Sequence, residues 1–370
     1  MPLIKINRKE LLEITKKINP APKSDKEGHS RAVTLLIQGD KLSVFSKNMR
    51  YRFRGIMDLL DNSEKIEEPF TFEMIPFFKF LGKLSDDEIT LHYTGSKVQV
   101  KILSGVINFE NYKRMAHKLI DDEFWKGRRL EFGEGSSRHL LNIMNICQKT
   151  NSMALTPEYK KCGIKDNNAY MWYGNIIVRI NNVHLPNFGF RFSDIPVLKK
   201  TVKDSDRFSL STAIRDYQVT TDTNFSLSYP YMKFEGIADA CTNVIEDSII
   251  QFEVPFETFK EVLGITSFVC GQFDTIQMLS KYGTADKKHH IMIESSTKTG
   301  RSLSYPLIKD YSGSEVSLKF NVGFIKQIVD LFNTLRNDVF DDKVIISVDS
   351  KRRAYFKYSN ISVVIGNLQR

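Results

Sequence analysis

The stretch Asn321-Val-Gly-Phe-Ile-Lys-Gln-Ile-Val-Asp-Leu-Phe-Asn-Thr-Leu-Arg336, with the strands that follow it, decides the fold. Its apolar side chains recur at the spacing of an amphipathic helix, at Ile325, Ile328, Val329, Phe332 and Leu335. Short runs of β-branched and aromatic residues come next and predict strands at 344–348, 354–358 and 361–365. One helix with a strand meander cannot bury its own apolar faces, so the stretch predicts further copies of itself.

The copies are present earlier in the chain. Ile75-Pro-Phe-Phe-Lys79 and Ile195-Pro-Val-Leu-Lys199 lie 120 positions apart, and each is followed by a Ser-Asp turn. Phe324-Ile-Lys326, followed by Asp341-Asp342, is a third copy with a longer helix. A repeat of this period is too long for a solenoid unit and suits tandem copies of a small domain. We therefore predict an α+β protein of three domains, at residues 1–115, 116–240 and 241–370.

The first domain divides into short elements. Two strand–helix openings alternate with short strands, which gives the order β-α-βββ-β-α-ββ. Pro76 lies in the first turn of the second helix, where its missing N–H costs nothing. The charged residues 104–129 are interpreted as a connector to the second domain, and residues 236–247 as a connector to the third.

Composition is typical of a cytoplasmic protein. No run approaches the roughly 18 apolar residues of a membrane span, and the N-terminus lacks the apolar core of a secretory signal. The four cysteines are far apart and share no Cys-x-x-Cys spacing, which favours reduced, buried thiols. The net charge of +9 permits attraction to a polyanion such as nucleic acid, and a bias toward solubility explains it equally well.

The sequence lacks the motifs of the common catalytic and cofactor sites. It has no phosphate-binding loop, no dinucleotide fingerprint and no zinc-ligand spacing. His289 and His290 are adjacent, so on a strand their rings would point to opposite faces. The pairs Asp86-Asp87 and Asp341-Asp342 could be metal carboxylates, but their repetition at helix-to-strand turns favours a structural role. We therefore expect a binding protein and not an enzyme, with no metal and no cofactor.

Basic residues recur on the predicted helices. On one helix they would be a solvated face, but six helices in tandem units share the bias. The third helix also carries a polar stripe without a carboxylate, at Arg138, Asn142, Asn145 and Lys149. No motif for base readout is present, so contact would be to phosphates and independent of sequence. The predicted DNA-facing residues are Arg8, Lys9, Lys16, Lys17, Lys79, Lys83, Arg138, Lys149, Lys199, Lys200, Lys203, Lys260 and Lys326.

Three local motifs resemble those of one protein family. Phe109-Glu-Asn-Tyr112 is similar to Phe-Pro-Asn-Leu, Tyr173-Gly-Asn-Ile-Ile177 to Asp-Gly-His-Arg-Leu, and Val363-Val-Ile365 to Val-Val-Met. With the threefold repeat and the length, the chain resembles a DNA polymerase sliding clamp of the bacterial three-domain type, in a divergent form such as bacteriophages carry.

The resemblance implies a DNA clamp fold of three β-α-βββ-β-α-βββ domains that form a ring segment, with helices inside and sheets outside. It also implies a homodimer closed head to tail around double-stranded DNA, acting as a processivity factor in the cytoplasm of a bacterial or phage-infected cell. DNA polymerase and a clamp loader would dock short peptides in an apolar pocket between the second and third domains. By position, the pocket residues are Leu155, Gly174, Asn175, Ile176, Ile177, Val363 and Ile365.

The sequence also departs from the family. Asn175-Ile176 stands where the family has His-Arg, and the chain ends Ile365-Gly-Asn-Leu-Gln-Arg370 instead of Met-Pro-Met-Arg-Leu. Truncation from Ile365 is predicted to abolish polymerase stimulation and to leave the oligomeric state intact. The family is usually acidic, whereas this chain is basic, which keeps open a monomeric processivity factor of the herpesvirus type. An enzyme of an unrecognised class, using Asp86 or Asp342, is a further alternative.

Overall fold

The computed structural model of the chain has two compact units. The first consists of Met1–Leu141 with Ser193–Tyr231, and the second of Asn142–Phe192 with Met232–Arg370. None of the described helices is long and apolar enough to cross a membrane. The structure describes residues 3–18, 32–48, 50–62, 69–93, 97–102, 105–111, 130–151, 160–174, 176–213, 216–234, 236–239, 241, 247–270, 274–296, 302–335, 342–351 and 353–366.

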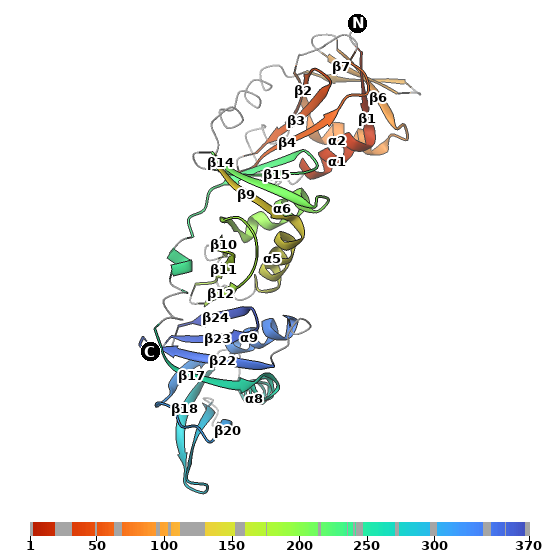
Figure 1. Ribbon diagram of the computed structural model, residues 1–370. Coiled ribbons are helices and arrows are strands. Elements are labelled where there is room, and N and C mark those ends of the chain that lie inside the picture. Colours follow the sequence, from red (N-terminus) through yellow and green to blue (C-terminus); the bar gives the residue numbers. More distant parts are fainter. Residues whose placement is uncertain are drawn as a thin grey trace. The chain divides into compact units, whose positions relative to one another are not determined.

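The first unit contains two antiparallel sheets (Figure 1). The four-stranded sheet has the order β1 (Leu3–Asn7), β6 (Glu88–Tyr93), β7 (Lys97–Ile102) and β8 (Gly105–Glu110). The eight-stranded sheet has the order β5 (Phe70–Glu73), β2 (Ala32–Gln38), β3 (Lys41–Lys47), β4 (Arg52–Asp58), β16 (Phe225–Pro230), β15 (Asp216–Thr221), β14 (Arg207–Ala213) and β9 (Leu130–Ser136). Its middle is the pairing of β4 with β16, which joins strands far apart in sequence.

Helices pack on these sheets through their apolar stripes. They are α1 (Arg8–Ile18), α2 (Met74–Lys83), α6 (Ile195–Val202) and the start of α5 (Ser137–Lys149), with a 3-10 turn at Phe192–Asp194 before α6. Helix α1 packs closely on β4 at Gly55, where the absence of a side chain makes room for Ile14. A Cβ atom at Gly55 would lie 2.4 Å from the Ile14 side chain. Phe77 of α2 packs 4.3 Å from Phe72 and 5.4 Å from Phe109 of β8, measured between ring centroids.

The second unit has the same two kinds of sheet. The eight-stranded sheet has the order β13 (Phe188–Arg191), β10 (Lys161–Lys165), β11 (Asn168–Trp172), β12 (Ile176–Ile180), β24 (Ile361–Ile365), β23 (Ala354–Tyr358), β22 (Lys343–Asp349) and β17 (Ser248–Pro255). The four-stranded sheet has the order β20 (Ser302–Lys309), β19 (Lys288–Ser296), β18 (Thr275–Gly283) and β21 (Ser317–Asn321). The helices are α8 (Phe256–Val269) and α9 (Val322–Leu335).

Aromatic side chains fill the core beneath α8 and α9. Tyr358 of β23 stacks on Phe256 at 4.7 Å between ring centroids and lies 5.3 Å from Phe332. In Figure 1, the blue strands β22, β23 and β24 lie side by side with α9 next to them. Gly163 and Gly189 face each other on β10 and β13, and a Cβ at Gly163 would lie 2.1 Å from Phe234. The glycine pair therefore leaves the space that the Phe234 ring fills.

In chain order the labelled elements of the described residues read β-α-βββ-β-α-βββ three times, which corrects the shorter order predicted from the residues. Residues 105–110 form strand β8 and not a connector, since they pair along their whole length with β7. Strand β9 and the β18–β20 meander are absent from the strands predicted from the residues; β9 is largely exposed, which hides its alternation. The predicted α+β class is confirmed. The domain boundaries at 115/116 and 240/241 stay a prediction.

Candidate nucleic-acid interface and partner surface

Each repeat ties the start of its first helix to the turn after its second helix. The backbone N–H of the first helical residue donates to the carbonyl of an aspartate in that turn. The pairs are Arg8 with Asp87 at 2.9 Å, Ser137 with Asp206 at 3.0 Å and Phe256 with Asp342 at 2.7 Å. The first N–H groups of a helix have no acceptor inside the helix, so the turn supplies one. These aspartates therefore hold the turns, while Asp341 lies outside the described residues.

Arg8 does not belong to a DNA-facing surface. Its side chain is only 10% exposed. Its Nη1 donates to the Leu81 carbonyl at 3.1 Å, and its Nε donates to the Asp86 carbonyl. The tie at the helix start presses this residue against the second helix, where a buried guanidinium must find acceptors. The prediction of a phosphate contact at Arg8 is corrected to a structural role.

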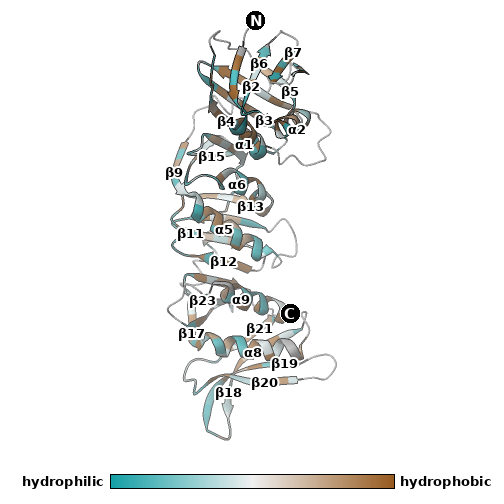
Figure 2. Ribbon diagram, turned by 90° about the vertical axis from the view of Figure 1, so that its right-hand side faces the viewer, coloured by the Kyte–Doolittle hydropathy of each residue, from teal (hydrophilic) through white to brown (hydrophobic). Residues whose placement is uncertain are grey.

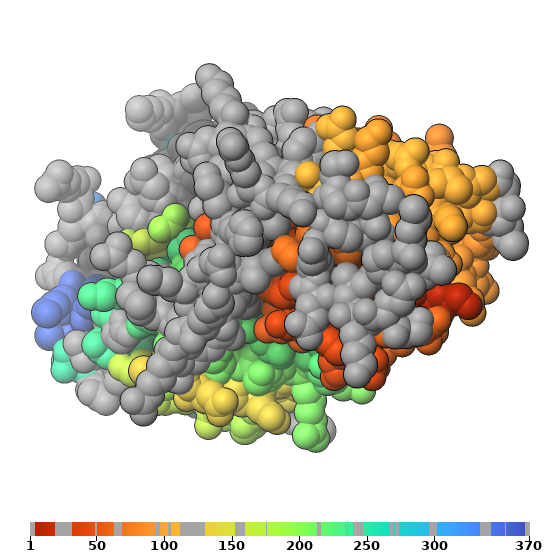
Figure 3. Space-filling view, turned by 90° about the horizontal axis from the view of Figure 1, so that it is seen from above, coloured from red at the N-terminus to blue at the C-terminus, as the bar shows by residue number. Residues whose placement is uncertain are grey.

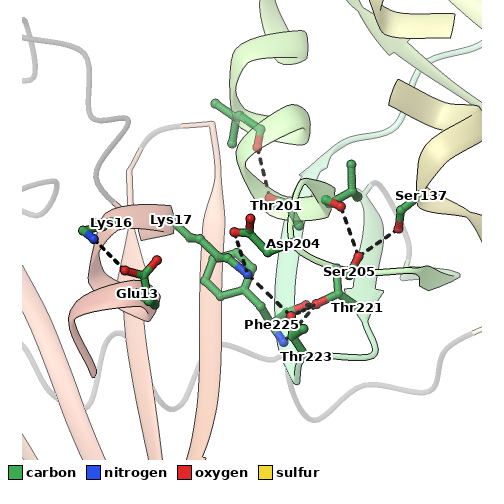
Figure 4. Close-up of polar contacts among 12 residues, drawn as sticks. Glu13, Lys16, Lys17, Ser137, Thr201, Asp204, Ser205, Thr221, Thr223 and Phe225 are labelled. Carbon is green, nitrogen blue, oxygen red and sulfur yellow. Dashed lines mark hydrogen bonds and ion pairs between the residues drawn. The ribbon is translucent and has the colours of Figure 1, made fainter. Parts of the chain in front are cut away.

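Lys17 is occupied within the first unit. Its side chain is 12% exposed, and Nζ lies 3.8 Å from Asp204 Oδ2 and 3.5 Å from Thr223 Oγ1. The amine also lies 5.7 Å from the centroid of the Phe225 ring. Figure 4 shows the side chain reaching from α1 to Asp204, just after α6, and to the β15–β16 turn. Lys17 therefore links two repeats, which corrects the prediction that it faces DNA.

A hydroxyl network holds the start of α5 beside the end of α6 (Figure 4). Ser137 Oγ lies 2.8 Å from Ser205 Oγ, which also donates to the Val202 carbonyl at 3.2 Å. Thr201 Oγ1 donates to the Val197 carbonyl at 3.0 Å. These bonds fix the helix ends that carry Arg138 and Lys203.

The other predicted DNA contacts differ in exposure. Lys9 and Lys16 are exposed but paired, with Asp87 at 2.9 Å and with Glu13 at 2.5 Å. Lys260 is half-buried and lies 3.9 Å from Glu257, and Lys199 is also half-buried. The exposed remainder consists of Lys79, Lys83, Arg138, Lys149, Lys200, Lys203 and Lys326.

The polar stripe predicted for the third helix lies on α5 and is exposed. Arg138, Asn142, Asn145 and Lys149 are all exposed, whereas Leu140 and Met144 are buried. In Figure 2, teal and brown segments alternate along this helix. The 3.6-residue period separates the two faces, so α5 presents basic and amide side chains without an intervening carboxylate.

A groove of about 390 Å³ in the first unit is partly acidic. Glu10 and Glu13 of α1 line it together with Asp58 and Asp204, over a floor that includes Ile14. Burial, followed by the charge of Asp58, raises the pKa of the Glu10 carboxyl above its usual range. The acidic groups lie next to Lys16 and Lys17 in the chain, so α1 offers less positive charge than its lysine count indicates.

The residues predicted for the partner pocket do not form one surface among the described residues. Leu155 and Asn175 lie outside the described residues, and Gly174 is half-buried with a φ of +90°. Ile176 pairs directly with Ile365 across the β12–β24 joint, so the prediction brings the right strands together. However, Ile176, Val363 and Ile365 are 1%, 0% and 2% exposed. Side chains alternate along a strand, and these three point into the core, which corrects their assignment to a ligand surface.

The face of the β12–β24 joint away from α8 and α9 carries a different apolar group, the outer cluster. Ile177 and Val364 are directly opposed, and Tyr355 is opposed to Val364 on the next strand. The cluster comprises Tyr170, Ile177, Ile237, Ala238, Cys241, Tyr355 and Val364. Of the predicted pocket residues that the structure describes, Ile177 alone belongs to it. The alternation of residues 361–365 was the signal that could have chosen Val364 over Val363.

Basic side chains cross the same face in a row. Arg179 is opposed to Ser362, and Lys357 is opposed to Ser362 from the other side. The Arg179 guanidinium lies 5.8 Å from the centroid of the Tyr170 ring, and Ser362 Oγ lies 2.8 Å from Tyr355 Oη. Burial raises the pKa of the Cys241 thiol to about 11, and the charge of Arg179 opposes this rise.

Solved structures match the whole chain. The DNA polymerase sliding clamp from Pseudomonas aeruginosa has 13% sequence identity and a TM-score of 0.67, with all of both chains covered. The clamp from Caulobacter crescentus has 11% identity and a TM-score of 0.68, also over all of both chains. The chain has the sliding-clamp fold. A DnaN sliding clamp from Pseudomonas aeruginosa bound to griselimycin is similar at 12% identity and a TM-score of 0.64, with the same coverage.

The clamp fold confirms the resemblance stated on the repeat. No protein-family model matches the sequence, and no curated protein matches it. The similarity lies in the arrangement of elements, with three complete β-α-βββ-β-α-βββ repeats, and not in the identity of side chains.

Proposed function

We propose that the chain is a polymerase processivity factor that closes a ring with a second copy of itself and encircles duplex DNA without catalysis. The proposal places it in the cytoplasm of a bacterial or phage-infected cell. The observation that carries it is a pairing rule between repeats. Each repeat has a three-strand meander after its first helix and another after its second helix. In each eight-stranded sheet, the last strand of the first meander of one repeat pairs with the last strand of the second meander of the next repeat. The two joints are β4 with β16 and β12 with β24.

By this rule, one last strand of a first meander and one last strand of a second meander have no partner among the described residues. β20 ends the first meander of the third repeat, β8 ends the second meander of the first repeat, and both are edge strands. A second copy would supply the missing partner, with β20 of one copy pairing with β8 of the other. Two copies have two β8 edges and two β20 edges, so two head-to-tail joints use all of these edges and close a ring.

The side chains of β8 fit an incomplete joint. Val106 and Ile107 are 50% and 38% exposed, whereas Leu227 and Val363 on the equivalent strands are fully buried. Ile107 lies opposite the buried Val100, so it is on the core face of its sheet. The amber surface of β7 and β8 is open in the view of Figure 3. A second copy would bury this apolar edge.

The surroundings of β20 support the same joint. A groove of about 480 Å³ runs beside it, lined by residues including Glu253, Glu261 and Tyr305. Helix α2, which contacts β8 through Phe77 and Phe109, carries the exposed Lys79 and Lys83. Lys309 also lines the groove and Glu253 is paired with Lys343 at 3.0 Å, so Glu261 is the acidic group of the groove that would face α2 of the second copy.

The exposed basic residues of α2, α5, α6 and α9 support DNA binding inside the ring. Contacts to phosphates are independent of sequence and weaken with salt, which suits a protein that slides. Because a closed ring holds DNA topologically, weak contacts are sufficient. We propose that DNA polymerase and a clamp loader dock short peptides on the outer cluster, where Ile177 and Ile237 are partly exposed apolar residues.

Ring closure is tested with Ile107→Glu, using Ile249→Glu as the matched control. Ile249 is an isoleucine, 63% exposed, on the edge strand β17 that the pairing rule does not use. Light scattering should give a dimer for the natural chain and for Ile249→Glu, and a monomer for Ile107→Glu. The dimer should remain on nicked circular DNA and slide off linear DNA. A natural chain that is monomeric at micromolar concentration and binds linear DNA tightly would instead support the monomeric, herpesvirus-type factor.

Partner docking is tested by measuring polymerase processivity with Ile177→Asp, which introduces a charge into the outer cluster. We expect stimulation to fall at least tenfold, with the dimer intact. Ile249→Asp, on another face of the same unit, should retain stimulation. Equal stimulation by both variants would remove the outer cluster from the partner site.

A further inference from the structure

We propose that Arg179 and Lys357, on either side of the buried Ser362, form a carboxylate-binding row, so the docking peptides carry an acidic residue beside their apolar residues. The inference rests on the proposed docking of peptides at the outer cluster and names the chemistry that selects them.

The row is continuous across three neighbouring strands. Arg179 on β12 is opposed to Ser362 on β24, and Ser362 is opposed to Lys357 on β23. Directly opposed residues on adjacent strands have Cβ atoms about 4.5–5.5 Å apart. The row therefore places a guanidinium and an amine on either side of Ser362, whose buried hydroxyl is bonded to Tyr355. The parallel row of Ile177, Val364 and Tyr355 lies two residues along the strands and is apolar.

The charges of this row are not balanced by the described part of the chain. Arg179 and Lys357 are both half-buried, and neither makes an ion pair among the described residues. The Nε atom of Arg179 is buried without a hydrogen-bond partner there. The neighbouring acid Asp239 is bonded to Lys165 at 3.1 Å. A half-buried cation without a counterion is costly, and a carboxylate from a ligand would remove that cost.

The equivalent joint in the first unit provides a natural comparison. Arg54 on β4 lies 5.5 Å from the Phe45 ring centroid and is opposed to Ser226, which matches the arrangement of Arg179, Tyr170 and Ser362. The position of Lys357 is taken by Thr220, which bonds to Ser226 at 3.0 Å. That joint therefore holds one cation next to a neutral hydroxyl pair, and lacks the two-sided site.

Selection from a phage-displayed library of random 12-residue peptides tests the row on the full-length chain. Peptides selected by the natural chain should be enriched in Asp or Glu beside Leu, Ile or Phe. Replacing the acid of a selected peptide by its amide should weaken its binding about tenfold, measured by fluorescence anisotropy. With Lys357→Glu, the acid-to-amide change should matter less than twofold. Arg54→Glu serves as the matched control and should behave like the natural chain.

The outcomes separate this inference from the proposal on which it rests. If the acid-to-amide change weakens binding equally in the natural chain and in Lys357→Glu and Arg179→Gln, the row does not bind the carboxylate. If selected peptides bind Ile177→Asp as well as the natural chain, the outer cluster is not the docking surface, and both fail. If the peptides need Ile177 but contain no excess of acids, the docking surface stands and the carboxylate row is overturned.

Discussion

Arg8 and Lys9 are neighbours in the sequence, but only one of them is structural. The Arg8 guanidinium is bonded to two backbone carbonyls in a part-buried site. Arg8→Ala leaves these acceptors unsatisfied, so we expect the free energy of unfolding to fall by about 2–3 kcal/mol. Lys9→Ala removes a residue that is 67% exposed and should change stability little. Urea unfolding followed by circular dichroism measures both, and equal stabilities would contradict the assignment of Arg8.

Cys241 predicts a dependence of stability on alkaline pH. Burial raises the pKa of its thiol from 9.0 to about 11 in the folded chain. The folded state then keeps a proton that the unfolded chain loses, so this contribution is complete below pH 9 and is lost as the pH rises toward 11. The loss over this window should be about 2 kcal/mol. Urea unfolding at several pH values should show a shallower fall in Cys241→Ala, and identical slopes would disprove the prediction.

At the scale of elements, β24 is the strand whose role changes most. The sequence prediction places Ile365 in the last strand and the partner pocket, and expects a chain truncated from Ile365 to keep its oligomeric state. The structure shows that Ile365 is 2% exposed and pairs with Ile176 and Ala354. Truncation from Ile365 should therefore damage the core of the joint. We expect Ile365→Asp to destabilise the chain by about 3 kcal/mol or more, while ending the chain after Gly366 leaves the melting temperature unchanged. Thermal unfolding of the two variants decides between a core strand and a tail.

At the scale of the whole molecule, the proposed pairing of the edge strands β8 and β20 between two copies predicts how stability depends on concentration. A dimer stabilises its folded subunits by mass action, so its melting temperature should rise with chain concentration. Ile107→Glu, which places a charge on the β8 edge, should lower the melting temperature and remove this concentration dependence. Differential scanning calorimetry at several concentrations provides the measurement. A natural chain whose melting temperature does not change with concentration would count against a dimer.

Much of the fold could be predicted from the sequence, because the repeat shows the same helices and turns at matching positions along the chain. The apolar spacing of residues 325–332 and the matched Ile-Pro stretches at 75 and 195 identify helices that the structure contains as α9, α2 and α6. Strand β8 could not be predicted, because it lies at the edge of its sheet and its apolar residues are largely exposed, so they show no buried face in the sequence. The burial of Arg8 could not be predicted either. The sequence around a basic residue at a helix start does not show whether its side chain faces water or bonds to backbone carbonyls.

The sequence by itself determined the threefold repeat, the α+β class and the basic character of the helices, since these depend on local periodicity and composition. Tertiary structure decided which lysines are available, because ion pairs and burial join residues such as Lys17 and Asp204 that are far apart in the chain. It also decided which face of β24 meets solvent. A register shift of one residue reverses every side chain of a strand, and only the pairing of β24 with β12 fixes that register.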